Sequence, residues 1–95
     1  MNNWHNQDTD LLCDALLKLE NIEEAYAFLE DVRTIKEIKD LSQRLRVAKM
    51  LRDVTSYLQI SRETGASTAT ISRVSRCLEY GAGGYKTVLE RSNED

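Results

Sequence analysis

The distribution of helix-breaking residues is the feature that most constrains this chain. The 95 residues contain no proline. The four glycines all lie in the last third of the sequence: Gly65, Gly81, Gly83 and Gly84. Residues 1–64 therefore lack both residue types that most strongly interrupt a helix. The sequence predicts an all-α fold, and its length predicts one domain over residues 1–95.

The composition indicates a chain that folds in water. It is 41% hydrophobic and 31% charged, which is too apolar for a disordered tail and too polar for a membrane protein. The N-terminus lacks the basic start and apolar run of a signal peptide, so we expect a cytoplasmic protein with no membrane partner. A domain this small buries about 60 to 70% of its extended-chain surface, so a partner subunit is expected to help stabilise it.

The two cysteines do not indicate a metal site. Neither Cys13 nor Cys77 has a Cys or His neighbour at metal-ligand spacing, and each falls on a helical pattern. We predict no metal, and we interpret both cysteines as small, reduced core residues.

Apolar spacing places three helices in the first half of the chain. A first helix is expected over residues 8–20, and a second runs to about residue 32 behind an N-cap at Asn21. A third helical stretch covers residues 34–52, with a kink or turn expected near Ser42. The alternative is one unbroken helix, because no glycine or proline enforces the break.

The second half of the chain contains the pattern of a helix-turn-helix. Ser56 and Gln59 have the spacing of a capping box, and about two helical turns follow as far as Thr64. Gly65 is expected to end this helix in the left-handed conformation, and Ser67 to cap the next one. With Tyr57 counted as position one, the characteristic positions are filled by Ile60 at four, Ser61 at five, Gly65 at nine, Ala66 at ten, Ile71 at fifteen and Val74 at eighteen.

Charge is distributed unevenly along the chain, although the net charge is −3. Residues 1–43 carry ten acids and four bases, whereas residues 44–76 carry seven bases and two acids, a net charge of +5 over 33 residues. A localised positive stretch attracts phosphate, although an ordinary solvated helix face would give a similar count.

The second helix of the motif, residues 67–79, presents short and basic side chains opposite Ile71 and Val74. A recognition helix places such residues against base edges and phosphates, and Ala69 suits a thymine methyl group. This pattern favours double-stranded DNA as the partner over a merely solvated face. The candidate DNA-binding residues are Ser56, Tyr57, Ser67, Thr68, Ala69, Thr70, Ser72, Arg73 and Arg76.

Several runs of residues resemble one known family. Gln-Arg-Leu-Arg-Val-Ala-Lys-Met-Leu at 43–51 and Thr-Gly-Ala-Ser-Thr-Ala-Thr-Ile-Ser-Arg at 64–73 are similar to the Trp repressor family, and residues 76–85 are similar to its YerC/YecD-type branch. The resemblance implies a six-helix subunit, intertwined with a second copy into a homodimer that binds operator DNA as a transcriptional repressor. The expected parts are dimerisation helices at 1–52, the helix-turn-helix at 55–79, and a C-terminal hinge and short helix at 80–95.

The resemblance also implies a site for an amino-acid corepressor. In the family, the ligand is held by arginines at the positions of Arg44 and Arg73 and by a threonine near Thr34 of the partner subunit. These residue types are retained here. Arg44 could instead flank the apolar stripe of its helix with its charge in solvent. We expect Arg73 to contact phosphate or base.

The sequence departs from the family where indole binds. Val74 stands in place of a glycine and Cys77 in place of a serine, while Asp31 and Arg33 correspond to leucines that cover the ring. We therefore expect no required cofactor and no use of L-tryptophan, because a side chain just after Arg73 fills the indole slot. The sequence leaves open whether a different small carboxylate is the ligand.

Two other functional classes fit the sequence less well. A helical dimer could act as a protein-protein interaction module without binding DNA, using its acidic first half and the hinge before Tyr85. An enzyme is not expected, because the single histidine, His5, lies near the terminus and no nucleophile, base and orienting acid occur together. The glycines at 81–84 follow a helix rather than a strand, so they do not form a phosphate loop.

Overall fold

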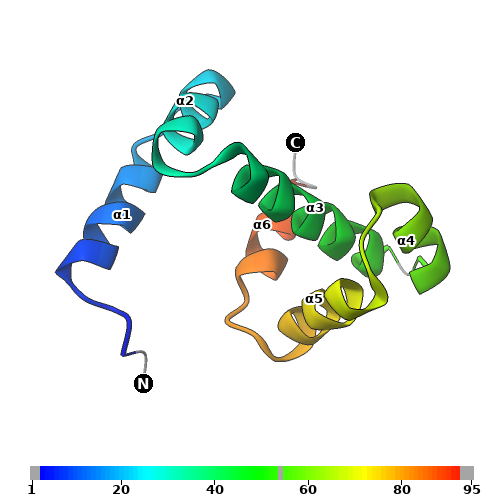
Figure 1. Ribbon diagram of the computed structural model, residues 1–95. Coiled ribbons are helices and arrows are strands. Elements are labelled where there is room, and N and C mark those ends of the chain that lie inside the picture. The colour runs from blue at the N-terminus through cyan, green and yellow to red at the C-terminus, as the bar shows by residue number, and fades with distance from the viewer. Residues whose placement is uncertain (1–2, 54, 93–95) are drawn as a thin grey trace. The chain divides into compact units, whose positions relative to one another are not determined.

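The computed structural model describes residues 3–53 and 55–92. Six α-helices and no strands make up the regular structure of these residues, which confirms the all-α prediction (Figure 1). The helices are α1 (Gln7–Leu17), α2 (Ile22–Val32), α3 (Ile35–Arg52), α4 (Tyr57–Thr64), α5 (Thr68–Tyr80) and α6 (Gly84–Ser92). None of the helices in this part of the chain is long and apolar enough to cross a membrane.

The chain divides into two compact units, residues 1–35 and 36–95. The first unit contains α1 and α2, whose N-caps are Asn6 and Asn21; the Oδ1 atom of each accepts a hydrogen bond from the backbone N–H three residues on, at 2.9 Å. The Asn21 cap was predicted and is confirmed. Neither helix has a buried residue. The expected organisation as one domain stays a prediction.

The second unit has its own apolar core. Figure 1 shows α4, α5 and α6 gathered around α3. Each of the four helices, and the turn between α4 and α5, contributes to one buried cluster: Val47, Ala48, Ile60, Ala66, Ile71, Val74 and Leu89. This core holds the helix-turn-helix against α3.

The predicted break near Ser42 is wrong, and the unbroken alternative is correct. Helix α3 continues from Ile35 to Arg52. The Ser42 hydroxyl donates to the carbonyl of Ile38, one turn earlier, at 2.8 Å, so the side chain bonds inside the helix. Without glycine or proline, a serine of this kind does not end a helix.

The interpretation of the cysteines as core residues is also wrong. Both Cys13 and Cys77 are free thiols with exposed side chains in this chain. Helical spacing placed Cys13 next to Leu12 and Leu16, which are 48% and 46% exposed. It placed Cys77 next to Val74, which is buried, but Cys77 itself lies outside the core.

Candidate nucleic-acid interface

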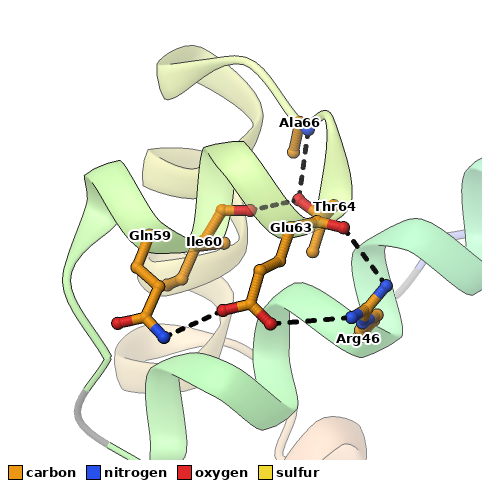
Figure 2. A network of polar contacts seen from close by, with 6 residues as sticks. All are labelled: Arg46, Gln59, Ile60, Glu63, Thr64 and Ala66. Carbon is orange, nitrogen blue, oxygen red and sulfur yellow. Dashed lines mark hydrogen bonds and ion pairs between the residues drawn. The ribbon is translucent and has the colours of Figure 1, made fainter.

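The first helix of the motif begins and ends at the predicted residues, and the second begins behind the predicted cap Ser67 but ends at Tyr80, one residue beyond the predicted end. The Ser56 hydroxyl accepts a hydrogen bond from the N–H of Gln59 at 3.3 Å, and the Ser67 hydroxyl accepts one from the N–H of Thr70 at 3.1 Å. Gly65 has a φ of +76°, a left-handed conformation that glycine adopts without steric cost. The Gln59 amide nitrogen donates to Glu63 Oε2 at 2.9 Å, which points this side chain along α4 (Figure 2).

The predicted apolar wedge lies between the two helices. Ile60 and Ile71 are fully buried, and Val74 is 2% exposed. Ser61, the small residue at position five of the motif, adds a hydrogen bond from its hydroxyl to the Ala66 carbonyl at 2.9 Å. The relative position of α4 and α5 is therefore fixed by packing and by a contact across the turn.

The outward face of α5 is open to solvent. Thr68, Ala69, Arg73 and Arg76 have exposed side chains, whereas Ser72 is half-buried. Ala69, Arg73 and Arg76 lie four and three residues apart, so they share one face of the helix. The first turn of α5, which lies wholly within the described residues, carries no acidic side chain. Its positive helix end is therefore available to phosphate.

The other candidate DNA-binding residues flank the starts of the two helices. Ser56, Tyr57 and Ser67 are exposed, and Thr70 is half-buried. The Ser67 hydroxyl donates to Thr70 Oγ1 at 3.1 Å, so these two hydroxyls are already paired with each other. Ser56 and Ser67 serve as helix caps, which orients the N-terminal ends of α4 and α5.

Two of the candidate ligand residues come together. Arg44 on α3 and Arg73 on α5 line one hollow of about 240 Å³. Asp40, Gln43 and Thr70 complete its lining. Two guanidinium groups beside one carboxylate leave this hollow with a net positive charge.

Within the second unit, Val74 and Cys77 do not line this hollow. Val74 is part of the buried core, and Cys77 lines a separate, mostly apolar hollow of about 540 Å³ together with Leu41 and Leu45. Thr34 belongs to the N-terminal unit, directly before α3. Across the described residues, no group of three or more His, Cys, Asp or Glu side chains is placed to hold a metal ion.

Two residues through which α3 contacts the end of α4 were not predicted from the sequence. Gln43 Nε2 donates to the Thr64 carbonyl at 3.0 Å, and Arg46 Nη1 donates to the Glu63 carbonyl at 3.3 Å. Their spacing of three residues on α3 is the only signal the sequence offers, and it shows that the two share a face without showing what that face meets.

The fold and this surface define an all-α protein with a helix-turn-helix. The family model described as Trp repressor protein matches residues 7–93, and the chain belongs to that family. The chain is 51% identical over 88 residues to the "Uncharacterized protein YerC" of Bacillus subtilis (strain 168), covering 93% of this chain and 85% of that protein.

Two solved structures are similar to the whole chain. A TrpR-like protein from Eubacterium eligens ATCC 27750 is 54% identical, with a TM-score of 0.93 over 98% of this chain and 96% of that one. A Staphylococcus aureus protein provisionally named a Trp repressor is 49% identical, with a TM-score of 0.90 over 96% and 91% of the two chains. The Trp repressor family is a family of DNA-binding regulators and not of enzymes.

Proposed function

We propose that this protein is a sequence-specific transcriptional repressor that binds a palindromic operator as a homodimer, with α5 as its recognition helix. The observation that carries the proposal is the outward face of α5. Ala69, Arg73 and Arg76 stand exposed on one side of a capped helix, while the opposite side of that helix is buried against α3 and α4. Short and basic side chains in this arrangement suit the major groove.

A homodimer is supported by the apolar surface of the N-terminal helices. Leu11 and Leu17 on α1 are 67% and 84% exposed, and Ile22 and Tyr26 on α2 are 65% and 63% exposed. Apolar area of this extent is usually covered by a partner. A two-fold axis would place two recognition helices about 34 Å apart, one turn of duplex, so they would read two half-sites of a palindrome.

The side chains of α5 are assigned separate roles in DNA binding. Arg76 is exposed at the third turn of the helix and is assigned to phosphate. Ala69 and Ser72 are short enough for the backbone to approach base edges. We therefore expect Arg76→Ala to weaken all sequences alike and to reduce the slope of the salt dependence by about one. Ser72→Ala should change which sequences are preferred, costing about 1 to 3 kcal/mol at one base pair.

Fluorescence anisotropy over a salt series, with a selected duplex and scrambled duplexes, measures both effects. Arg91→Ala is a matched control, because Arg91 is an exposed arginine in the last turn of α6. If neither Arg76→Ala nor Ser72→Ala alters binding, α5 is not the recognition helix.

The decisive experiment is selection of bound fragments from randomised duplex DNA, with and without candidate metabolites. We expect enrichment of a palindrome without any added metabolite. Enrichment of an asymmetric site would contradict the dimeric mode of binding. If no sequence is enriched under any condition, the alternative of a protein-protein interaction module is favoured instead.

Binding without tryptophan follows from the position of Val74. Its side chain is 2% exposed and belongs to the core that joins α3, α4 and α5. The protein therefore fills with its own side chain the slot that the family leaves open for indole. On this proposal the core alone holds α5 in the DNA-binding geometry, so no ligand is needed to shift the chain towards it.

Calorimetry with millimolar L-tryptophan is expected to give no heat of binding, and the affinity for the selected operator should not change when tryptophan is added. A saturable signal coupled to tighter operator binding would contradict the filled-slot argument. We infer that a different small carboxylate would bind, if any does, in the hollow between Arg44 and Arg73, and the same titration with other amino acids or keto acids tests it.

A further inference from the structure

The last turn of α4 is held on α3 by two side chains. Gln43 Nε2 donates to the Thr64 carbonyl at 3.0 Å, and Arg46 Nη1 donates to the Glu63 carbonyl at 3.3 Å. The final carbonyl groups of a helix have no partner inside that helix. Helix α3 supplies donors to two of them, and we call these two hydrogen bonds the α3–α4 clamp.

An ion pair lies beside the clamp (Figure 2). Arg46 Nη2 is 3.9 Å from Glu63 Oε1, and the side chains are 57% and 43% exposed. Exposed pairs at this separation contribute little, because water screens them and both side chains lose freedom. The hydrogen bonds to the carbonyl groups, rather than the charge pair, are therefore the main polar contacts that hold the end of α4, in addition to the packing of the apolar core.

The restraint passes from α4 into the turn. Thr64 Oγ1 donates to the Ile60 carbonyl at 2.7 Å and accepts from the N–H of Ala66 at 3.1 Å, as Figure 2 shows. Ala66 is buried and lies directly before the cap of α5. Thr64 is the last residue of α4, and its carbonyl is held by Gln43 of α3. A shift of this carbonyl relative to α3 is therefore transmitted to the start of α5.

We propose that Gln43 and Arg46 are positioning residues, which fix the helix-turn-helix on α3 so that α5 is held ready for DNA without a small-molecule ligand. This inference rests on the proposed function, because its value to the protein is the operator affinity. Neither residue lies on the outward face of α5 that was assigned to DNA. Their effect reaches DNA through Thr64 and the turn.

Gln43→Met is the sharpest test, because methionine keeps the length of the side chain, removes the donor and leaves the charge unchanged. We expect faster amide hydrogen exchange at Gly65 and Ala66, a three- to tenfold weaker affinity for the selected operator, and an unchanged slope of the salt dependence. Arg46→Met should also speed exchange at these two amides.

Lys39→Met provides the matched control. Lys39 is exposed and lines the same hollow on α3 as Gln43 and Arg46. This variant removes a neighbouring positive charge while the clamp stays intact. It should leave the exchange of the Gly65 and Ala66 amides at the wild-type rate.

The possible results separate the clamp from the proposed function. Unchanged exchange in Gln43→Met overturns the clamp, whatever DNA binding shows, and faster exchange with unchanged operator affinity overturns the positioning role. For Arg46, normal exchange with a salt slope reduced by about one would make it a phosphate contact instead. A wild-type protein that selects no DNA, although exchange in Gln43→Met is faster, overturns the proposed function and the positioning role but leaves the clamp as a structural contact.

Discussion

At micromolar concentration the purified protein is expected to have twice the 10.9 kDa mass of one chain, and substitution of two leucines on α1 is expected to abolish this dimer. Leu12 and Leu16 lie one helical turn apart and are 48% and 46% exposed. Burial of a leucine side chain contributes about 1.5 to 3 kcal/mol. A symmetric dimer contains four of these side chains, each about half exposed in a single chain, so the lost burial alone costs at least about 3 kcal/mol. The double variant Leu12→Asp, Leu16→Asp should therefore raise the dissociation constant by at least about 10²-fold.

Light scattering after size exclusion measures the mass of each variant. Asp14→Asn is the matched control, because Asp14 lies on the other side of α1 from Leu12 and is already polar.

If the double variant does not fold, the wild type gives a second measurement. The melting temperature of an obligate dimer rises with protein concentration, whereas that of a monomer does not. A wild-type monomer with a concentration-independent melting temperature would contradict the dimer.

Local chemistry made the helix-turn-helix predictable. Ser56, Gly65 and Ser67 act within a few residues of their own positions, as caps or as a left-handed turn, so their effects are visible in the sequence. The apolar wedge followed for the same reason, since Ile71 and Val74 lie on one face of a short helix.

Contacts between distant segments were not predictable. Gln43 reaches a backbone carbonyl 21 residues away, and a carbonyl group has no signature in the sequence. The interpretation of the two cysteines as core residues was wrong for a related reason. Helical spacing identifies the apolar side of α1 or α5, but whether that side is covered depends on what packs against it, and here Cys13 and Cys77 are exposed.

The candidate ligand residues were only partly predictable. Arg44 and Arg73 were expected together from the resemblance to the family, and they share one hollow. Cys77 lines a different hollow. Because Cys77 is four residues from Arg73, helical spacing alone places both on one face of α5 and does not show that they meet different hollows. Asp40 was not anticipated, and its carboxylate beside the two arginines reduces the attraction of this hollow for an anion.

Val74→Gly is expected to destabilise the fold by about 3 kcal/mol. About 2 kcal/mol comes from the loss of buried apolar groups in the cluster that joins α3, α4 and α5. A further contribution of about 1 kcal/mol comes from the cost of glycine inside a helix relative to alanine. Val74→Ala separates the two contributions, because it removes most of the side chain and places alanine, a strong helix former, in the helix.

Urea unfolding at one fixed protein concentration measures both variants, since the stability of a dimer depends on that concentration. Val74→Ala should lose about 2 kcal/mol and Val74→Gly about 1 kcal/mol more. Losses below about 0.5 kcal/mol in both variants would show that Val74 is not part of a tightly packed core. The two variants also test the filled slot directly. If Val74→Gly binds tryptophan while Val74→Ala and the wild type do not, the valine side chain is what excludes indole, because only glycine lets a ring lie against the backbone of α5.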